Sequence, residues 1–590
     1  MAKIVTENFK VETTNELYRS FLNENESTVQ SFKTSLDSYN ANENVELSPS
    51  EVDTITDLVR GEINRYLPEN NYYVFASSID KTQDITNSQF EKREFLRRVV
   101  FGKKMTTSGI KYMFSRRPWT PGTVYDDFDD VSNVEDLNMF VTVPDGEQNE
   151  GPYKVFKCIA NGNDSPSTVK PSVNSTDPTI EVLLADGYIW KYMFNIPVSE
   201  YAEYSTINSL PYVEDVRITN NALEDISNIL IEDTQTGLFA GYNPGTVRLQ
   251  SIVAAAGENR WELEFITGET SPRSGRGAYV GMYLRFDRDG EVYDIVDSRV
   301  ISAGQNNKTV FLTITSVGNP RDSYDVLLDD AEILPKIAIS PSNDVDTGVN
   351  AKAYGRLDVN GTLNEIYFVN KGSGYKYATA KISLPPALEL DNPNPEAVTR
   401  LRTIISPRGG HGSDPISELF MSRLAIITNF FSDSGSDIPD NGTYTKVGLV
   451  KNPSFRDGTF TDTIDNRMRI VIDGGSAPLA SVGQYLVEEQ TDQTIHARIH
   501  EITQESGSYV IYCVDYTGDY NANFTLGAEL KVKDSLTSES FETVTINNNS
   551  GSVTLGNYVP FTGDLLHFVD FDPIERQPDR KEKIKFVFDF

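Results

Sequence analysis

Hydrophobic and polar residues alternate along most of the chain after residue 72, a pattern typical of β-strands that bury one face. Runs rich in Val, Ile, Thr, Tyr and Phe predict strands at YKVFKCIA (153–160), WELEFIT (261–267), TVFLTITSV (309–317) and YVIYCVDY (509–516). In FDRDGEVYDIV (286–296), Asp289-Gly290 stands between two such runs and predicts a hairpin. We therefore expect a mainly β fold.

Helical spacing is confined to the N-terminal part of the chain. Thr13-Thr14-Asn15-Glu16 matches a capping box and predicts a helix that starts there. Ser48-Pro49-Ser50-Glu51 is a second capping box with proline at the first helical position. Apolar residues then recur at steps of three and four until Pro68, and predict a second helix. The polar residues 22–47 predict a connection or a solvated helix.

Clusters of Pro, Gly, Asn and Ser divide the chain near residues 215, 345 and 460. We predict a multi-domain β-sandwich core with a helical N-terminal insertion and additional β insertions. The predicted parts are an N-terminal segment with a helical insertion (1–71), a β-sandwich core (72–215), an inserted β-rich domain (216–345), a β unit with glycine-turn strands and the GGHGSDP loop (346–460), and a β-rich region whose C-terminal strand returns to the core (461–590). Segments 161–178, 341–350 and 431–443 predict exposed loops.

The net charge of the chain limits the classes of partner that it is expected to bind. Lys and Arg number 53 against 86 Asp and Glu, a net charge of −33, so the surface repels phosphate backbones and we expect no nucleic-acid partner. Cys158 and Cys513 lie far apart in sequence and predict neither a disulfide framework nor a metal cluster, as in a reducing cytoplasm. No window approaches the ~18 apolar residues that span a bilayer, and the start lacks the apolar run of a secretion signal. We expect no membrane insertion.

The stretch RGGHGSDP (408–415) most resembles an active site. A phosphate-binding loop would need a lysine after its last glycine, and here that lysine is missing. A Ser-His-Asp site would need three side chains that converge in space, whereas His411, Ser413 and Asp414 are nearly consecutive in one small loop. PISELFMSRLAI, which follows, has helical character, so Ser413 or Asp414 is expected to be the N-cap, with Pro415 in the first turn. We predict a structural loop formed by Gly409, Gly410, His411, Gly412 and Asp414. The glycines, rather than the histidine, should be needed for folding.

The pair His496 and His500, and the acidic cluster YDDFDD, each have two interpretations. His496 and His500 have the spacing of a helical zinc pair, but Ala497 replaces the glutamate that a metalloprotease needs. Their alternation with apolar residues predicts a strand whose solvated face carries both histidines ~14 Å apart. In YDDFDD (125–130), neighbouring carboxylates could serve a glycosidase or bind calcium, but in an acidic chain they are expected to face water. A glycosidase pair assembled from distant segments stays open.

Aromatic segments point to a known family. SRRPWTPGTVYDDFDD (115–130), YKVFKCIANGN (153–163) and ADGYIWKYMFNIP (185–197) occur in an order and spacing that resembles the baseplate wedge subunit of T-even-type contractile-tailed bacteriophages, the gene-product-eight family. Further segments are similar to parts of that family: KIVTENFKVETTNELYRSF (3–21), YYVFASS (72–78), GTLNEIYFVNKGSGYKYATAKISL (361–384), RGGHGSDPISEL (408–419), VGLVKNPSF (447–455) and LLHFVDFDPIERQPDRKEKIKFVFDF (565–590). Residues 23–71 and 216–345 have no counterpart in it, so the chain resembles an enlarged member.

The resemblance implies a structural virion protein of the tail baseplate, assembled in the host cytoplasm. It implies a homodimer within each wedge, contacts with other baseplate wedge proteins, and a role in baseplate assembly and in triggering contraction. We expect no enzymatic activity, no cofactor and no bound metal. Two alternatives remain: a receptor-binding or glycan-binding tail protein, and a tail-associated glycan hydrolase that uses paired acidic residues.

Two places in the sequence are candidate interfaces. Trp190 in DGYIWKYMFNI is expected in the sandwich core, whereas Trp119, beside Arg116 and Arg117 and between two prolines, is the better interface candidate. Near the C-terminus, IKFVFDF (584–590) alternates and predicts a strand docked into the core formed by residues 72–215. Before it lies a basic loop, in which Arg580 and Lys581 are expected to face an acidic patch. A solvated charge run is the alternative.

Overall fold

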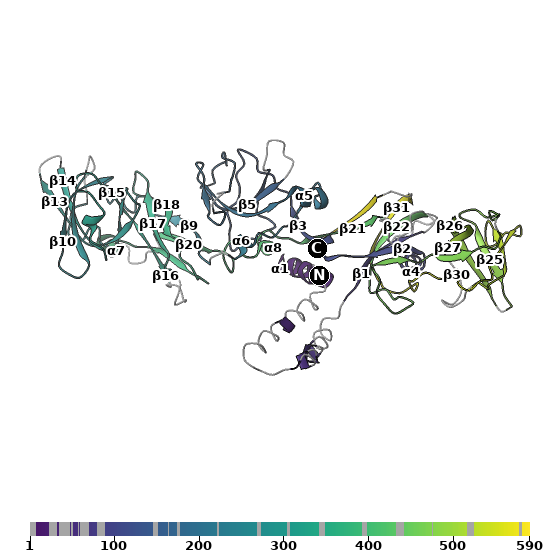
Figure 1. The fold of residues 1–590 in the computed structure, drawn as a ribbon. Helices are drawn as coiled ribbons and strands as arrows, with labels where there is room; N and C mark the ends of the chain where they lie inside the picture. The colour runs from purple at the N-terminus through teal and green to yellow at the C-terminus, as the bar shows by residue number, and fades with distance from the viewer. Residues whose placement is uncertain are drawn as a thin grey trace. The chain divides into compact units, whose positions relative to one another are not determined.

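The computed structural model describes residues 7–22, 32–34, 48, 51–52, 54–56, 58–59, 70–78, 89–144, 152–162, 164–173, 177–220, 224–267, 273–303, 307–340, 349–391, 398–431, 442–474, 476–491, 493–515, 524–576 and 581–590. The chain divides into two compact units, called unit 1 (Met1–Met113 with Ser422–Phe590) and unit 2 (Phe114–Met421). Both units are mainly β (Figure 1), as the alternation predicted. The boundaries expected near 215, 345 and 460 fall inside these units, and residues 72–215 are shared between them.

The helices of unit 1 lie before and between its first strands. They are α1 (Glu7–Leu22), α4 (Gln89–Arg97) and the 3₁₀ turn η1 (Thr107–Gly109). The capping box predicted at 13–16 is wrong, because α1 begins earlier and the Thr13 and Thr14 hydroxyls donate to the carbonyls of Phe9 and Lys10, one turn back. At the second capping box, the Ser48 amide donates to Glu51 Oε2 over 2.8 Å, and residues 51, 52, 54–56, 58 and 59 are helical.

Three sheets make up the rest of unit 1. One has the strand order β23-β2-β1-β22-β31, another pairs β21 with β32 and β3, and a seven-stranded sheet has the order β29-β28-β25-β26-β27-β24-β30. Their bounds are β1 (Tyr72–Ser77), β2 (Val99–Lys104), β3 (Ile110–Ser115), β21 (Arg423–Phe431), β22 (Gly442–Lys451), β23 (Thr463–Asp465), β24 (Met468–Val471), β25 (Tyr485–Glu489), β26 (Thr494–Glu505), β27 (Ser508–Val514), β28 (Glu529–Lys533), β29 (Glu542–Thr545), β30 (Val553–Thr554), β31 (Asp564–Arg576) and β32 (Lys581–Asp589).

The C-terminal strand predicted from IKFVFDF is confirmed as β32. It pairs antiparallel with β21, from Arg423↔Asp589 to Phe431↔Lys581, and it buries Phe586. The strand was expected to dock into the core formed by residues 72–215, but it does not pair directly with that segment, because β21 lies between it and β3. β3 of that segment belongs to the same sheet as β32.

Unit 2 holds a four-stranded sheet (order β4-β5-β7-β6), the strand pair β9-β20, a closed barrel (β10-β11-β14-β13-β12-β15) and a second four-stranded sheet (β18-β17-β16-β19). The strands are β4 (Phe140–Pro144), β5 (Tyr153–Asn161), β6 (Val182–Leu183), β7 (Tyr188–Ile196), β8 (Ser209–Pro211), β9 (Ile226–Thr234), β10 (Val247–Ala254), β11 (Arg260–Thr267), β12 (Tyr283–Phe286), β13 (Val292–Ala303), β14 (Asn307–Thr315), β15 (Asp330–Leu334), β16 (Lys336–Ser340), β17 (Lys352–Leu357), β18 (Leu363–Asn370), β19 (Thr379–Ile382) and β20 (Thr399–Ile405). The helices are α5 (Val198–Tyr204), α6 (Val216–Thr219), η2 (Pro320–Asp322), α7 (Pro386–Asp391) and α8 (Pro415–Glu418).

The barrel forms where the sequence alternates most regularly. The predicted strands at 261–267 and 309–317 are β11 and β14, and they pair with each other. The predicted hairpin is β12–β13, with Gly290 at φ +75° in its turn. Buried residues of the barrel and of the sheet β16–β19 form one continuous core, which includes Leu263, Leu312, Ile337 and Ala353. The two elements therefore stabilise each other.

The sheet β4–β7 has an aromatic core of its own. Trp190 is fully buried, as expected, and its ring stacks on Tyr188 with 5.6 Å between centroids. Tyr125, from the YDDFDD segment, meets Trp190 edge-on at 5.5 Å. No described helix has the length and hydrophobicity needed to cross a membrane.

Candidate functional site: a buried network around His411

The RGGHGSDP loop turns by means of its glycines. Gly409, Gly410 and Gly412 have φ values of +82°, +87° and +89°, a region that side-chain-bearing residues rarely adopt. Asp414 is the N-cap of α8, since its carboxylate accepts the Ser417 amide at 3.2 Å. The Ser413 hydroxyl instead donates to the Arg408 carbonyl at 2.6 Å.

His411 is an interior residue rather than an exposed loop side chain. It is 4% exposed, and its ring meets Phe128 edge-on at 4.9 Å. Its Nε2 lies 2.7 Å from the Ser227 hydroxyl, and its Nδ1 lies 3.0 Å from Lys157 Nζ. We therefore expect His411 to matter for folding as well as the glycines, because both of its ring nitrogens have buried hydrogen-bond partners.

Lys157 and Glu418 complete the network. Lys157 Nζ, which is fully buried, donates to Glu418 Oε2 over 2.7 Å and lies 4.0 Å from the centre of the Phe128 ring. The other carboxylate oxygen of Glu418 accepts the amides of Gly412 at 2.7 Å and Asp414 at 3.3 Å. The Glu418 side chain of α8 therefore bonds both to the backbone of the preceding loop and to Lys157 of β5.

Charge and burial decide the protonation states in this network. Burial, and then the charge of Lys157, lower the pKa of His411 to about 4, so the imidazole is neutral at pH 7. A lysine ammonium can only donate, so Nδ1 accepts from it and the Nε2–H donates to Ser227. Burial by itself would raise the pKa of Glu418, but the charge of Lys157 holds it at about 2. Burial lowers the pKa of Lys157, and Glu418 opposes that shift.

The network is suited to holding the fold rather than to reacting. Lys157, Ser227, His411 and Glu418 are each at most 4% exposed, so a substrate could not reach them without opening the core. The polar atoms already bond to one another, and they join β5, β9 and α8. Sequence reasoning missed Lys157, Ser227 and Glu418. The one signal was a lysine in the middle of the apolar run YKVFKCIA, where both faces of the strand are buried.

Asp126 and Asp130 of YDDFDD are exposed, as expected, whereas Asp127 and Asp129 are half-buried, and some of these carboxylates also hold neighbouring segments together. Asp129 binds Arg402 Nη1 of β20 at 2.9 Å, and Asp130 accepts the Ile405 amide at 3.2 Å. Asp127 is half-buried, and burial raises its pKa to about 6. In the described part of the chain, no group of three or more His, Cys, Asp or Glu side chains could hold a metal ion.

The candidate interface residues of the first half make contacts within unit 2. Arg116 donates to the Thr206 carbonyl at 3.0 Å, and its guanidinium lies 5.3 Å from the Tyr201 ring centre. Arg117 donates to the Leu137 carbonyl and lies 4.5 Å from the Phe140 ring centre. Trp119 is half-buried against the core, with its Nε1 3.1 Å from the Ser167 hydroxyl. A role at an interface stays a prediction for all three.

The candidate interface residues near the C-terminus, Arg580 and Lys581, are not fully described by the structure. Arg580 is outside the described residues, and only the backbone of Lys581 is described, as the first residue of β32. Arg576, which belongs to the same basic stretch, is buried and lies 3.3 Å from Glu582 in an ion pair. At least this part of the stretch is therefore not a solvated charge run.

His496 and His500 both lie on β26, but they do not share a solvated face. A register irregularity between Ile499 and Glu501 turns His500 inward, and its side chain is buried. Burial, and then the nearby Arg467 and Arg498, lower the pKa of His500 to about 3. The predicted solvated strand face is therefore wrong for His500 and holds only for the half-exposed His496.

Comparisons with known proteins give no family. No protein-family model matches the chain, and no curated protein matches it either. The resemblance to the baseplate wedge family rests on the sequence segments quoted above.

Proposed function

We propose that this chain is a structural component of a phage contractile-tail baseplate, of the wedge type. It acts through protein–protein interfaces in baseplate assembly and in the triggering of contraction, as a homodimer that contacts other wedge proteins in the virion. The observation that carries the proposal is where the family-like segments lie. Segments that are far apart in sequence, each similar to a part of that family, pack directly against one another.

In unit 1, segments from the start, the middle and the end of the chain meet in one sheet. β1 of YYVFASS pairs with β22 of VGLVKNPSF, as in Tyr73↔Val450, and β22 pairs with β31 of the closing segment, as in Val447↔Val569. Helix α1, from the family-like N-terminus, packs on the same sheet through Phe21 and Tyr72, whose ring centres are 4.4 Å apart. These family-like segments therefore build one sheet and a helix that packs on it.

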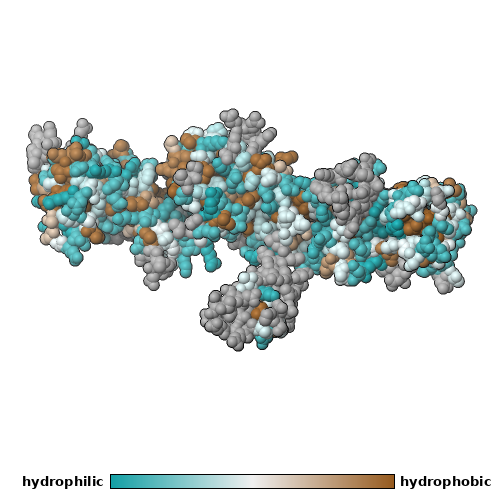
Figure 2. Space-filling view, viewed as in Figure 1, coloured by the Kyte–Doolittle hydropathy of each residue, from teal (hydrophilic) through white to brown (hydrophobic). Residues whose placement is uncertain are grey.

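The buried network supports a role without chemistry. The loop that most resembles an active site has its histidine bonded to Lys157 and Ser227 in the interior. Hydrophobic side chains that are exposed on loops, such as Val131 at 77% and Ile207 at 90%, supply contact groups for partners. Over the face seen in Figure 2, hydrophobic side chains occur in separate groups among hydrophilic ones.

Reconstitution tests this proposal. The purified chain, mixed with the other baseplate wedge proteins of its phage, is expected to elute with them in one complex in size-exclusion chromatography. Ile207→Asp places a charge in a prospective contact and should weaken that complex, whereas Thr459→Asp, on an exposed turn of unit 1, is the control. A chain that stays separate from every wedge protein, and is missing from purified tails, contradicts the proposal.

A second candidate, a tail-associated glycan hydrolase, is favoured by one observation. Asp127 is a half-buried carboxyl with a pKa of about 6, near the charges of Asp164 and Asp129, which is a property of general acids. Incubation with host surface polysaccharide tests it. Release of reducing ends that Asp127→Asn abolishes, and that the exposed control Asp457→Asn retains, would establish the hydrolase.

A further inference from the structure

The sheet β18-β17-β16-β19 of unit 2 has an outer face that differs in charge from the rest of the chain. Its inner face packs on the barrel through Ile337, Ala353 and Leu363. Because side chains alternate along strands, the opposite face carries a separate set of residues. On that face lie four cations, Lys336, Lys352, Arg356 and Lys381, against the single carboxylate of Glu365. In a chain of net charge −33, this is a local reversal of sign.

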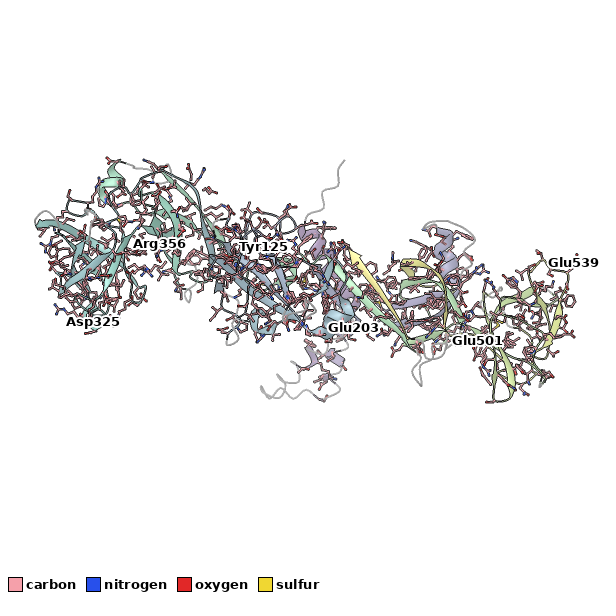
Figure 3. The ribbon with its side chains drawn as sticks, turned by 90° about the horizontal axis from the view of Figure 1, so that it is seen from above. Tyr125, Glu203, Asp325, Arg356, Glu501 and Glu539 are labelled. Atoms are coloured by element: carbon pink, nitrogen blue, oxygen red, sulfur yellow. The ribbon has the colours of Figure 1, made fainter. Side chains whose placement is uncertain are left out.

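Two tyrosines form a flat surface among these cations. Tyr354 of β17 and Tyr367 of β18 are directly opposite each other, with ring centres 5.8 Å apart and planes inclined by 16°. Tyr354 is 7% exposed because it packs in one cluster with Tyr283, Val292 and Leu334 of the barrel, whereas Tyr367 is 38% exposed. The Arg356 guanidinium lies 5.0 Å from the Tyr367 ring centre, and Figure 3 labels this side chain.

The charges of this face are only partly neutralised by the protein. Lys336 pairs with Asp294 of the barrel at 2.6 Å. Lys352 Nζ donates to the Val292 carbonyl at 3.2 Å, and neither it nor Arg356 has a carboxylate partner among the described residues. Glu365 instead accepts the Tyr367 hydroxyl at 2.5 Å. Lys352 Nζ lies 5.7 Å from the ring centre of Tyr283 in the barrel, so Arg356 supplies the positive charge beside the exposed Tyr367 ring.

We propose that this face binds an anionic saccharide, a glycan that bears carboxylate or phosphate groups. The Tyr367 ring packs against the apolar face of a sugar ring, and Arg356, which lies beside that ring, binds its acidic group. Tyr354 supports Tyr367 from the neighbouring strand. The site adds a ligand to the proposed structural role, and it stands whether or not the chain belongs to a baseplate.

The size and composition of the face favour a saccharide over a macromolecule. Four strands at ~4.8 Å spacing and about 20 Å in length cover roughly 300 Å², less than the ~800 Å² per partner of a stable protein interface. Three of the four cations are lysines, a residue depleted at the centres of protein interfaces. A long nucleic acid gains its affinity from many phosphate contacts, and the acidic remainder of the chain would oppose them. A short glycan is small enough to contact this face without contacting the acidic remainder of the chain.

Calorimetric titration of the full-length protein tests the proposal with defined probes. Oligogalacturonate and a phosphorylated mannose oligosaccharide represent the two acidic groups, and maltohexaose is the neutral comparison. We expect both anionic probes to bind, maltohexaose to bind at least tenfold more weakly, and added salt to weaken the anionic probes. Arg356→Ala and Tyr367→Ala should each weaken anionic binding at least tenfold, whereas Tyr367→Trp, which keeps a ring, should retain it.

A matched control lies in unit 1, where Lys531 Nζ is 5.0 Å from the centre of the exposed Phe541 ring. Lys531→Ala and Phe541→Ala remove a similar cation and ring from another sheet, and should leave binding unchanged. Circular dichroism checks that every variant is folded. The proposal is overturned if neither anionic saccharide binds, if the Arg356 and Tyr367 variants bind as well as the wild type, or if poly-glutamate or a short single-stranded oligonucleotide binds more tightly than both saccharides.

Discussion

Lys157 and Glu418 are 261 residues apart in sequence, and Lys157 Nζ lies 2.7 Å from Glu418 Oε2 in the interior of unit 2. Both side chains are buried, so each charge depends on the other to offset the loss of its hydration. The pair fixes the RGGHGSDP loop against β5, because the same carboxylate also accepts two amides of that loop.

Removing one member of this pair should be strongly destabilising. Lys157→Met leaves Glu418 buried without a counter-charge, and we expect a loss of about 3–5 kcal/mol in the free energy of unfolding. The double variant Lys157→Met/Glu418→Leu removes both charges and should recover much of that loss. Trp119, Trp190 and Trp261, the three tryptophans of the chain, all lie in unit 2, so tryptophan fluorescence during urea denaturation reports on this unit. A Lys157→Met variant as stable as the wild type would contradict this account of the pair.

Acid should destabilise unit 2 in a defined pH range. The pKa of His411 is about 4 in the folded state, below the value of ~6.5 expected when unfolded, so the unfolded chain takes up the proton first. The stability that neutral His411 provides is complete above pH ~6.5 and is lost as the pH falls towards 4, on the order of 3 kcal/mol. The contribution of Glu418, whose pKa is about 2, is lost only below about pH 4.5.

The measurement is the urea midpoint of tryptophan fluorescence between pH 7.5 and 4.5. His411→Gln should lower stability at pH 7 and flatten the decline between pH 6.5 and 4.5. His500→Gln serves as the control, because His500 lies in unit 1 and should not alter this signal. An unchanged slope in His411→Gln would show that other groups cause the decline.

Gly412 of the RGGHGSDP loop is expected to tolerate a side chain less well than Gly122, which lies in a turn after Trp119. Gly412 has φ +89°, and a Cβ there would lie 2.4 Å from Ile218 Cγ2, so Gly412→Ala combines backbone strain with a clash. Gly122 has φ +83° with nothing within 4 Å of the position of a Cβ, so Gly122→Ala measures the strain alone. We expect Gly122→Ala to cost about 1–2 kcal/mol and Gly412→Ala clearly more. Equal losses in the two variants would mean that the loop moves away from Ile218.

Deleting residues 582–590 should prevent correct folding of unit 1. The deletion removes most of β32, exposes one edge of β21 and leaves Arg576 buried without Glu582. We expect insoluble protein, measured as the fraction in the supernatant after lysis. Arg580→Glu/Lys581→Glu should instead give soluble protein whose association with partners is weaker and more sensitive to salt. A soluble deletion variant that still assembles would contradict the structural role of β32.

Local patterns predicted several strands correctly, because alternation is a property of neighbouring residues. The runs at 153–160, 261–267, 309–317 and 509–516 contain most of β5, β11, β14 and β27, and Asp289-Gly290 is a hairpin turn. The N-cap was limited to Ser413 or Asp414, since only a short polar side chain before Pro415 could accept the amides of α8. The predictions failed where one local motif is compatible with two structures. Thr13 and Thr14 bond one turn back inside a helix instead of capping it.

The sequence by itself determined the mainly β character, the positions of many strands, the turns that need glycine and the acidic charge of the chain, because each depends on residues close together along the chain. Only the tertiary structure decided that Lys157, His411 and Glu418 share one buried network, that a bulge turns His500 inward, and that β32 pairs with β21. The physical reason is that burial and pairing depend on which distant segments meet. The charge state of a buried histidine, or the partner of a strand edge, is set by side chains hundreds of residues away, and no local pattern records them.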